Sequence, residues 1–336
     1  MSKNPQQTAY MYASSRVRAL EVGIIGKDRI EHLADAADLG ELYARLEEYG
    51  VTLIRDEQGS VLTEPVLQGI LSVTLQNVLE SVPAPELYDF LRYPYDCHNI
   101  KAAIKCHLRG LDAAPMMIAL GSADCKEVAK MPEKGDFSPL PTAMAKAAEL
   151  AVQAYAKTAN PRTIDVLLDK ACFADMLACA KKGGEAFHVQ LVRTRIDLIN
   201  VMICLRLVRM QAGEQGAVLL EQAMLDGGTL EKALLMQVYG QGETALTDML
   251  AHTSYDKFAT ALRESDGTSA SAERLADDFF MELLRTARYT TFGASVPTAY
   301  FYAQEYAVKN IRIVIAAKSA GLKPETIRER IRTSYV

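Results

Sequence analysis

Two Cys-His pairs in one short segment are the first residues whose types suggest chemistry. Residues 95–110 read YDCHNIKAAIKCHLRG, with pairs at Cys97-His98 and Cys106-His107. A structural zinc ion needs four such ligands converging on one point. The segment has apolar residues at helical spacing and no Gly or Pro before Gly110, so we expect a helix that ends there. The two cysteines are then about two and a half turns apart and face opposite sides, as do the histidines. We therefore expect buried cysteines and surface histidines, with no metal bound.

Other catalytic or cofactor patterns are weak. The fragment GIIGKDR at 23–29 has two residues between its glycines instead of the four of a phosphate-binding loop, and Asp28 stands where Ser or Thr would hold magnesium. The five histidines form neither an HExxH pattern nor a triad. Asp165 and Asp169 share a helix face that we interpret as solvated. We expect no catalytic residue and no cofactor.

Charge and hydropathy exclude several classes of protein. The chain has 336 residues and a formal net charge of -5, which argues against nucleic acid as a partner. Its richest apolar run, LINVMICLRLV from Leu198, is interrupted by Asn200 and Arg206, so we expect no transmembrane span. The first twenty residues lack the apolar run of a secretory signal, and the six cysteines lack disulfide-framework spacing. A cytoplasmic protein fits these features.

Helical periodicity dominates the chain and predicts an all-α fold. It is clearest over residues 16–50, 65–82, 141–159 and 272–290. Asn160-Pro161 predicts a helix start, with a capping side chain followed by proline in the first turn. Segments 121–141 and 263–273 are predicted loops, the first a plausible domain boundary, and 51–62 is predicted as a short hairpin or an extended loop.

A motif recurs three times along the chain. Each copy has an acid, then an asparagine, then an apolar and basic helix that ends at a glycine, after which a new short helix is predicted. The copies are Asp96, Asn99 and Gly110; Asp197, Asn200 and Gly213; and Glu305, Asn310 and Gly321. This recurrence predicts three helical units, residues 1–112, 113–213 and 214–336, because the period far exceeds that of solenoid repeats.

The asparagine is the unusual residue of this motif. Asn200 interrupts an apolar stripe that includes Ile196 and Cys204, so we expect it to be buried and hydrogen-bonded. Asp197, one turn earlier, is a well-placed partner, whereas Glu305 stands five residues before its asparagine. Two interpretations stay open: a structural clamp that sets the angle of each unit's long helix, or a substrate or ion site.

Several segments together carry a resemblance to a known family. They are YASSRVRALE (12–21), YPYDCHNIKAAIK (93–105), NPRTIDVLLDKACFADML (160–177), RTRIDLINVMICLR (193–206) and the stretch EYAVKNIRIVIAAKSAGLKPETIRERIRTSYV (305–336). In order and spacing the chain resembles the C subunit of the bacterial and archaeal V/A-type ATPases, whose eukaryotic counterpart is the d subunit of the V-ATPase. The two Cys-His pairs are not part of that family's pattern.

The resemblance implies a funnel-shaped, pseudo-threefold helical protein without an active site. It implies a rotor component that lies between the central-shaft subunits D and F and the membrane proteolipid ring (the K/c subunit), near the membrane stator (the I/a subunit), on the inner face of the cell membrane. A protein in this position couples ATP synthesis or hydrolysis to proton or sodium transport. Arg328, Arg330 and Arg332 are candidates for an acidic partner, although a solvated helix face explains them as well.

Two functions from other classes remain as alternatives. A helical scaffold unrelated to rotary motors would purify as a stable monomer without affinity for a proteolipid ring. A helical enzyme would bring Asp96, Asp197 and Glu305 together in an open pocket with strongly shifted pKa values.

Overall fold

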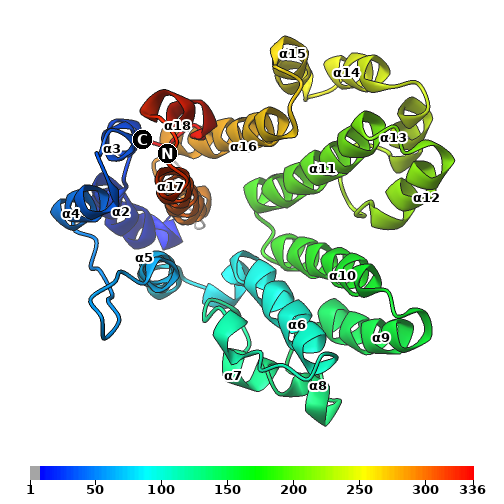
Figure 1. The fold of residues 1–336 in the computed structure, drawn as a ribbon, viewed down its shortest axis with the longest axis horizontal. Helices are drawn as coiled ribbons and strands as arrows, with labels where there is room; N and C mark the ends of the chain where they lie inside the picture. Colours follow the sequence, from blue (N-terminus) through cyan, green and yellow to red (C-terminus); the bar gives the residue numbers. More distant parts are fainter. Residues whose placement is uncertain (1–7) are drawn as a thin grey trace. The chain divides into compact units, whose positions relative to one another are not determined.

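The computed structural model describes residues 8–336, which form helices and loops without a strand. The only strand-like pairing in this range is an antiparallel bridge between Arg55 and Val61. The all-α prediction is confirmed. The chain forms two compact units, one built from the residues up to 84 together with 260–336 and the other from residues 85–259 (Figure 1).

The first unit is organised around one long central helix. Its α-helices are α2 (Met11–Leu20), α3 (Lys27–Ala34), α4 (Leu39–Glu48), α5 (Thr63–Ser81), α16 (Ser269–Arg285), α17 (Ser295–Ser319) and α18 (Pro324–Arg330). Helix α17 contacts the other six, and Figure 1 shows it nearly end-on among them. It buries side chains on most of its sides, including Phe301, Tyr302 and Ile311. A helix that is apolar nearly all round belongs in a core.

The second unit is built on two long consecutive helices. Its α-helices are α6 (Tyr93–His107), α7 (Cys125–Val128), α8 (Met131–Lys134), α9 (Thr142–Thr158), α10 (Pro161–Lys182), α11 (Ala186–Arg209), α12 (Gly213–Ala223), α13 (Lys232–Tyr239) and α14 (Glu243–Ala251), and α15 (Asp256–Glu264) crosses the boundary at residue 260. Helix α10 packs against α6, α9 and α11. It begins as predicted, because the Asn160 side chain accepts a hydrogen bond from the Arg162 backbone N–H at 3.0 Å.

Three local predictions need correction or refinement. The periodic stretch 16–50 is split over α2, α3 and α4, because the backbone becomes extended at Ile24 and Gly26 and again at Asp38, which caps α4. Segment 51–62 forms the hairpin, one of the two predicted alternatives, and turns at Gly59. Segment 121–141 contains α7 and α8 and lies inside the second unit.

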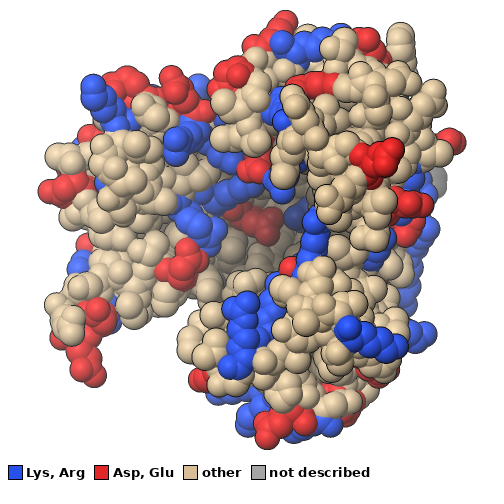
Figure 2. Space-filling view, turned by 45° about the vertical axis from the view of Figure 1, so that its right-hand side comes forward, with Lys and Arg blue, Asp and Glu red and all other residues tan. Residues whose placement is uncertain are grey.

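The described helices and surface agree with the composition. Within residues 8–336, no helix combines the length and apolar content that crossing a bilayer requires. Lys and Arg are interspersed with Asp and Glu on the face drawn in Figure 2, as the small net charge leads one to expect.

Candidate functional site

Each of the three asparagines of the repeated motif clamps one backbone position further along the chain. The side-chain amide donates from Nδ2 to the backbone carbonyl, and Oδ1 accepts from the N–H of the same residue. The clamped pairs are Asn99 with Ile118, Asn200 with Leu225 and Asn310 with Arg332. In that order the Nδ2 to O distances are 2.8, 3.0 and 3.0 Å, and the N to Oδ1 distances are 2.8, 2.7 and 2.8 Å.

The clamp explains why a polar residue interrupts an apolar stripe. All three asparagines are at most 1% exposed. A carboxamide offers donors and an acceptor in one plane, so it can satisfy the donor and the acceptor of one residue at once. The predicted burial and hydrogen bonding of Asn200 are confirmed. The predicted partner was wrong, because Asn200 bonds the backbone of Leu225 instead of the Asp197 carboxylate.

The acid of the first motif copy, Asp96, bonds the loop that follows the clamped residue Ile118. Asp96 is fully buried and accepts hydrogen bonds from the backbone N–H of Ser122 at 2.9 Å, the Ser122 hydroxyl at 2.6 Å and the backbone N–H of Ala123 at 3.1 Å. Burial raises the pKa of the Asp96 carboxyl, and these three donors oppose the shift only in part. Asp96 and Asn99 therefore fix the loop 118–123 against α6.

The acid of the second copy has the same arrangement plus one more donor. Asp197 accepts from the backbone N–H of Thr229 at 2.9 Å, from the backbone N–H of Leu230 at 3.0 Å and from the Thr229 hydroxyl. The Tyr255 hydroxyl also donates to it, at 2.7 Å. Burial, followed by the charge of Asp197, raises the pKa of Tyr255, which therefore stays a neutral donor.

A glycine in each of these two clamped loops lets the carboxylate approach the backbone. A Cβ added at Gly121 would lie 2.2 Å from Oδ1 of Asp96, and one added at Gly228 would lie 2.1 Å from Oδ1 of Asp197. Each glycine follows the clamped residue by three positions and directly precedes the Ser or Thr that bonds the acid. This Gly-Ser/Thr pair was not predicted from the sequence. Its recurrence after Ile118 and Leu225 is the signal that would have found it.

The helix-ending position of the motif lies eleven residues after each asparagine. In the second copy this position is Gln211, and the prediction of Gly213 was wrong. Gly110 and Gly321 have positive φ values of 66° and 70°, but the residue at this offset in the second copy is Gln211, with φ 51°. In all three copies the next N–H bonds back five residues, from Leu111, Ala212 and Leu322 at 2.9, 3.3 and 3.0 Å. Gly213 also has a positive φ, of 52°, but lies two residues further on. The short helix predicted after Gly110 is only a 3₁₀ turn, Ala114–Met116.

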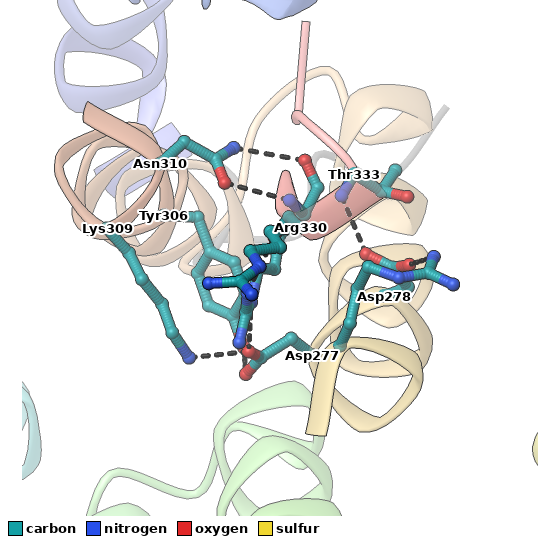
Figure 3. Close-up of polar contacts among 9 residues, drawn as sticks. Asp277, Asp278, Tyr306, Lys309, Asn310, Arg330 and Thr333 are labelled. Carbon is teal, nitrogen blue, oxygen red and sulfur yellow. Dashed lines mark hydrogen bonds and ion pairs between the residues drawn. The ribbon is translucent and has the colours of Figure 1, made fainter. Parts of the chain in front are cut away.

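The third copy takes an acid from a different helix. Ala307 stands three residues before Asn310, where the other copies have Asp. Asp278, on α16, accepts instead from the backbone N–H of Thr333 at 2.6 Å (Figure 3). Glu305 is half-buried, whereas Asp96 and Asp197 are fully buried. Glu305 therefore does not occupy the buried position that Asp96 and Asp197 have in the first two copies.

Beside Asp278, Asp277 gathers three donors. The Arg332 Nε donates to Oδ2 at 3.0 Å, the Tyr306 hydroxyl donates to Oδ1 at 3.2 Å, and Lys309 forms an ion pair with Oδ2 (Figure 3). The side chain of Arg332 is 12% exposed and that of Asp277 is 17% exposed. Arg332 therefore has a structural partner within its own unit.

The two other candidate arginines are exposed. Arg328 forms an ion pair with Asp35, which directly follows α3. The guanidinium of Arg330 makes neither an ion pair nor a hydrogen bond with another residue of the described range, and its carbonyl accepts from Arg332 at 2.6 Å. Of the three candidates, Arg328 and Arg330 are the ones accessible to a partner.

The two Cys-His pairs have separate surroundings. Cys97 and Cys106 are buried, with Sγ 3.5 Å from Leu168 O and 3.7 Å from Met116 Sδ respectively. His98 and His107 are exposed. Among residues 8–336, no three His, Cys, Asp or Glu side chains come together in a way that could hold a metal ion.

Grooves in the first unit are separate from the acids of the motif. One, of about 980 Å³, lies between α16, α17 and α18 and has Ile313, Ala316, Ala320 and Arg330 in its lining. Asp96 and Asp197 are fully buried and bonded to backbone N–H groups, so neither carboxylate faces solvent where a substrate would bind. This geometry is typical of residues that stabilise packing.

Comparison with known proteins assigns the family. The model of the ATP synthase (C/AC39) subunit family matches residues 13–330. The C subunit of the A-type ATP synthase of Thermococcus kodakarensis is 25% identical, over 96% of this chain and 90% of its own length. The C subunit of the V-type sodium ATPase of Enterococcus hirae is 22% identical over 95% and 97%, and that of the A-type ATP synthase of Methanocaldococcus jannaschii is 22% identical over 95% and 85%. The chain therefore belongs to the C/AC39 family of V/A-type ATP synthase subunits.

Proposed function

We propose that this protein is a non-catalytic rotor subunit of the central stalk. In this role it links the shaft subunits D and F to the membrane proteolipid ring and couples ATP synthesis or hydrolysis to proton or sodium transport. The protein then lies at the inner face of the cell membrane, held there by its partners and close to the I/a subunit of the stator. The observation that carries the proposal is the family match over residues 13–330, with relatives covered over most of their own length.

The site geometry supports a mechanical role over a chemical one. The buried acids and amides of the motif bond backbone groups within their own units, so they join helices to the segments that follow them. Stiff connections of this kind suit a protein that transmits rotation. We further propose that the three motif copies mark three related units, residues 1–112, 113–213 and 214–336, arranged with pseudo-threefold symmetry.

The alternatives find less support. A scaffold unrelated to rotary motors does not account for the family match. A helical enzyme needs the motif acids in an open pocket, whereas Asp96 and Asp197 are 0% exposed. Neither alternative is favoured by a specific observation.

Reconstitution of the complex with and without this protein tests the coupling role. ATP hydrolysis by the catalytic head should persist without it, because the head carries its own active sites, while ATP-driven ion uptake into vesicles should stop. Uptake that persists in its absence would reject the coupling role. Loss of hydrolysis in the isolated head would point to a catalytic or assembly function.

A charge-reversal series tests the interface within the same assay. The double variant Arg328→Glu/Arg330→Glu removes the two exposed arginines of α18, and Lys126→Glu/Lys130→Glu is a matched control at exposed lysines in the second unit. If α18 meets an acidic partner, the first variant should lower ion uptake with its fold intact. Equal uptake by both variants would assign Arg328 and Arg330 to a solvated face.

A further inference from the structure

The groove between α16, α17 and α18 has an apolar floor. One face of α17 supplies most of it through Ile313, Ala316 and Ala320, which are three and four residues apart, and Leu322 and Ile331 complete it. Ala316 and Ala320 are exposed. From Ile313 to Ala320 the floor extends over about 10 Å, or roughly two helical turns. An open floor of this length suits a segment of another protein better than a small molecule, which a pocket encloses.

The lining is charged differently at α18 and at the corner between α15 and α16. Three arginines and one glutamate line the groove at and just after α18, whereas two carboxylates line it at the corner. In that order the residues are Arg328, Arg330, Arg332 and Glu329, then Glu264 and Asp266. A partner that complements this lining has an acidic edge toward α18 and a basic edge toward the corner.

Arg330 is the cation of this lining that is available to a partner. The lining contains four arginines, and three of them form ion pairs within the unit. The pairs are Arg274 with Asp278 at 3.1 Å, Arg332 with Asp277 at 3.0 Å, and Arg328 with Asp35. Arg330 is exposed, and its guanidinium forms no ion pair with another residue of 8–336. An exposed guanidinium beside an apolar floor can bind a carboxylate of a partner that covers the floor.

The backbone around the groove favours a helical partner over an extended one. The N–H and carbonyl groups in the middle of α17 are hydrogen-bonded within the helix, so the floor offers no sheet edge to which an extended chain could add. A helix satisfies its own backbone and presents apolar side chains at positions i, i+3, i+4 and i+7. Such a face can cover Ala316 and Ala320 while a residue at its edge meets Arg330.

We propose that this groove receives an amphipathic helix of another subunit of the complex, with its apolar face on α17, an acidic residue bound to Arg330 and a basic residue facing Glu264. This inference rests on the proposed function, because the partner is a component of the same complex. A second copy of this chain and a lipid are the other occupants that the experiment distinguishes.

Photo-cross-linking in the purified complex tests the proposal. A diazirine amino acid replaces Ala320, at the end of the floor, and the complex is reconstituted, purified and irradiated before mass spectrometry maps the cross-linked peptides. We expect a segment of a different subunit that has apolar residues at helical spacing and an Asp or Glu at the edge of that face. The same diazirine amino acid in place of Ala156, an exposed alanine of α9, should not cross-link to that segment.

Charge reversal tests the polar contacts of the helix. Arg330→Glu, combined with the diazirine amino acid at position 320, should lower the cross-link yield about tenfold, because it places like charges together. Glu264→Lys should lower the yield for the same reason at the basic edge. Arg162→Glu, at an exposed arginine of α10, should leave the yield unchanged.

Gel filtration of each reconstituted complex separates this inference from the proposed function. A protein that joins the complex overturns the groove assignment alone if it gives no cross-link from position 320, or links only to lipid or to a second copy of itself. A linked segment without a carboxylate at the edge of an apolar face does the same, as do equal yields for Arg330→Glu and Arg162→Glu. A wild-type protein that fails to join the complex rejects the proposed function, and the groove assignment with it.

Discussion

The α-carbon of Gly121 lies so close to the Asp96 carboxylate that a single added methyl group would stand 2.2 Å from Oδ1. The close approach lets Asp96 accept two backbone N–H groups and a hydroxyl of the following residues. Gly121→Ala should therefore push the loop away from α6. We expect the free energy of unfolding to fall by about 1–3 kcal/mol, the usual cost of overpacking.

Urea titration measures this loss, and α5 offers a matched control. Gly69 lies inside this helix, and a Cβ added there meets nothing within 4 Å. Gly69→Ala should stabilise the protein by about 0.5–1 kcal/mol, because alanine is the better helix former. If both changes had the same sign, the carboxylate contact at Gly121 would not be what fixes that loop.

Replacing a clamping amide tests the motif itself. Asn200→Leu removes two hydrogen bonds and leaves the buried N–H and carbonyl of Leu225 without their partner. We expect a loss of about 1–3 kcal/mol in the free energy of unfolding, because unsatisfied buried polar groups are costly. Gln222→Leu, at an exposed position of α12, should change it by less than about 0.5 kcal/mol. An unchanged melting temperature for Asn200→Leu would favour a binding role for the motif.

The left-handed backbone conformation of Gln211 is strained, and a glycine at this position should relieve the strain. Its φ of 51° is unfavourable for a residue with a side chain, and the other two motif copies have glycine at this offset. Gln211→Gly should raise the free energy of unfolding by about 1 kcal/mol. Gln215→Gly, inside helix α12, should lower it by a similar amount. Differential scanning calorimetry of the two variants should show melting temperatures that move in opposite directions.

The buried carboxyl of Asp96 makes stability depend on pH. Burial raises its pKa in the folded state, so the folded chain binds more protons than the unfolded chain between the ordinary and the raised pKa. Its contribution to stability is thus greatest below the ordinary carboxyl pKa and is lost as pH rises through the raised pKa. The difference in stability, wild type minus Asp96→Asn, should therefore decrease with rising pH in urea titrations.

Asp136 provides a control with the opposite sign. The backbone N–H of Ser138 lowers the pKa of this exposed carboxyl. The difference between wild type and Asp136→Asn should therefore increase as pH rises through the range in which carboxyls titrate. Equal slopes for the two aspartates would contradict the role assigned to the burial of Asp96.

The two arginines at and just after the end of α18 should behave differently. Arg332→Ala removes the nearly buried ion pair with Asp277, although Lys309 and Tyr306 still bond that carboxylate. We expect a loss of about 1–3 kcal/mol in the free energy of unfolding. Arg330→Ala, at an exposed guanidinium, should change it by less than about 0.5 kcal/mol. Unfolding in guanidinium chloride compares them, and a larger effect for Arg330 would contradict these contacts.

The sequence predicted features that depend on local chemistry. Helical periodicity indicated the all-α class, and the Asn160-Pro161 pair indicated the start of α10, because capping and proline geometry act within one turn. The burial of Asn200 followed from its place in an apolar stripe. These properties can be read from neighbouring residues.

Long-range partners could not be predicted in the same way. The backbone of Leu225 is a generic donor and acceptor, so nothing in its side chain marks it as the partner of Asn200. Asp278 bonds the clamped segment of the third copy from α16, which precedes Asn310 by many residues. Gly213 was assigned as the helix-ending position by residue type, whereas the backbone places Gln211 there. Conformation, and not residue identity, defines that position.

The discontinuous make-up of the first unit sets the order in which a newly made chain can fold. Helices α2 to α5 are synthesised early, but α16, α17 and α18 come only after residue 260. At roughly 5–20 residues per second, the ribosome needs on the order of 10–35 s to make the intervening second unit. During that interval α5 lacks its central partner α17 and leaves apolar residues such as Leu71, Leu75 and Val78 uncovered. The second unit, contiguous in sequence, can fold on emergence, whereas the first half of the other unit stays exposed to aggregation until residues 260–336 have been made.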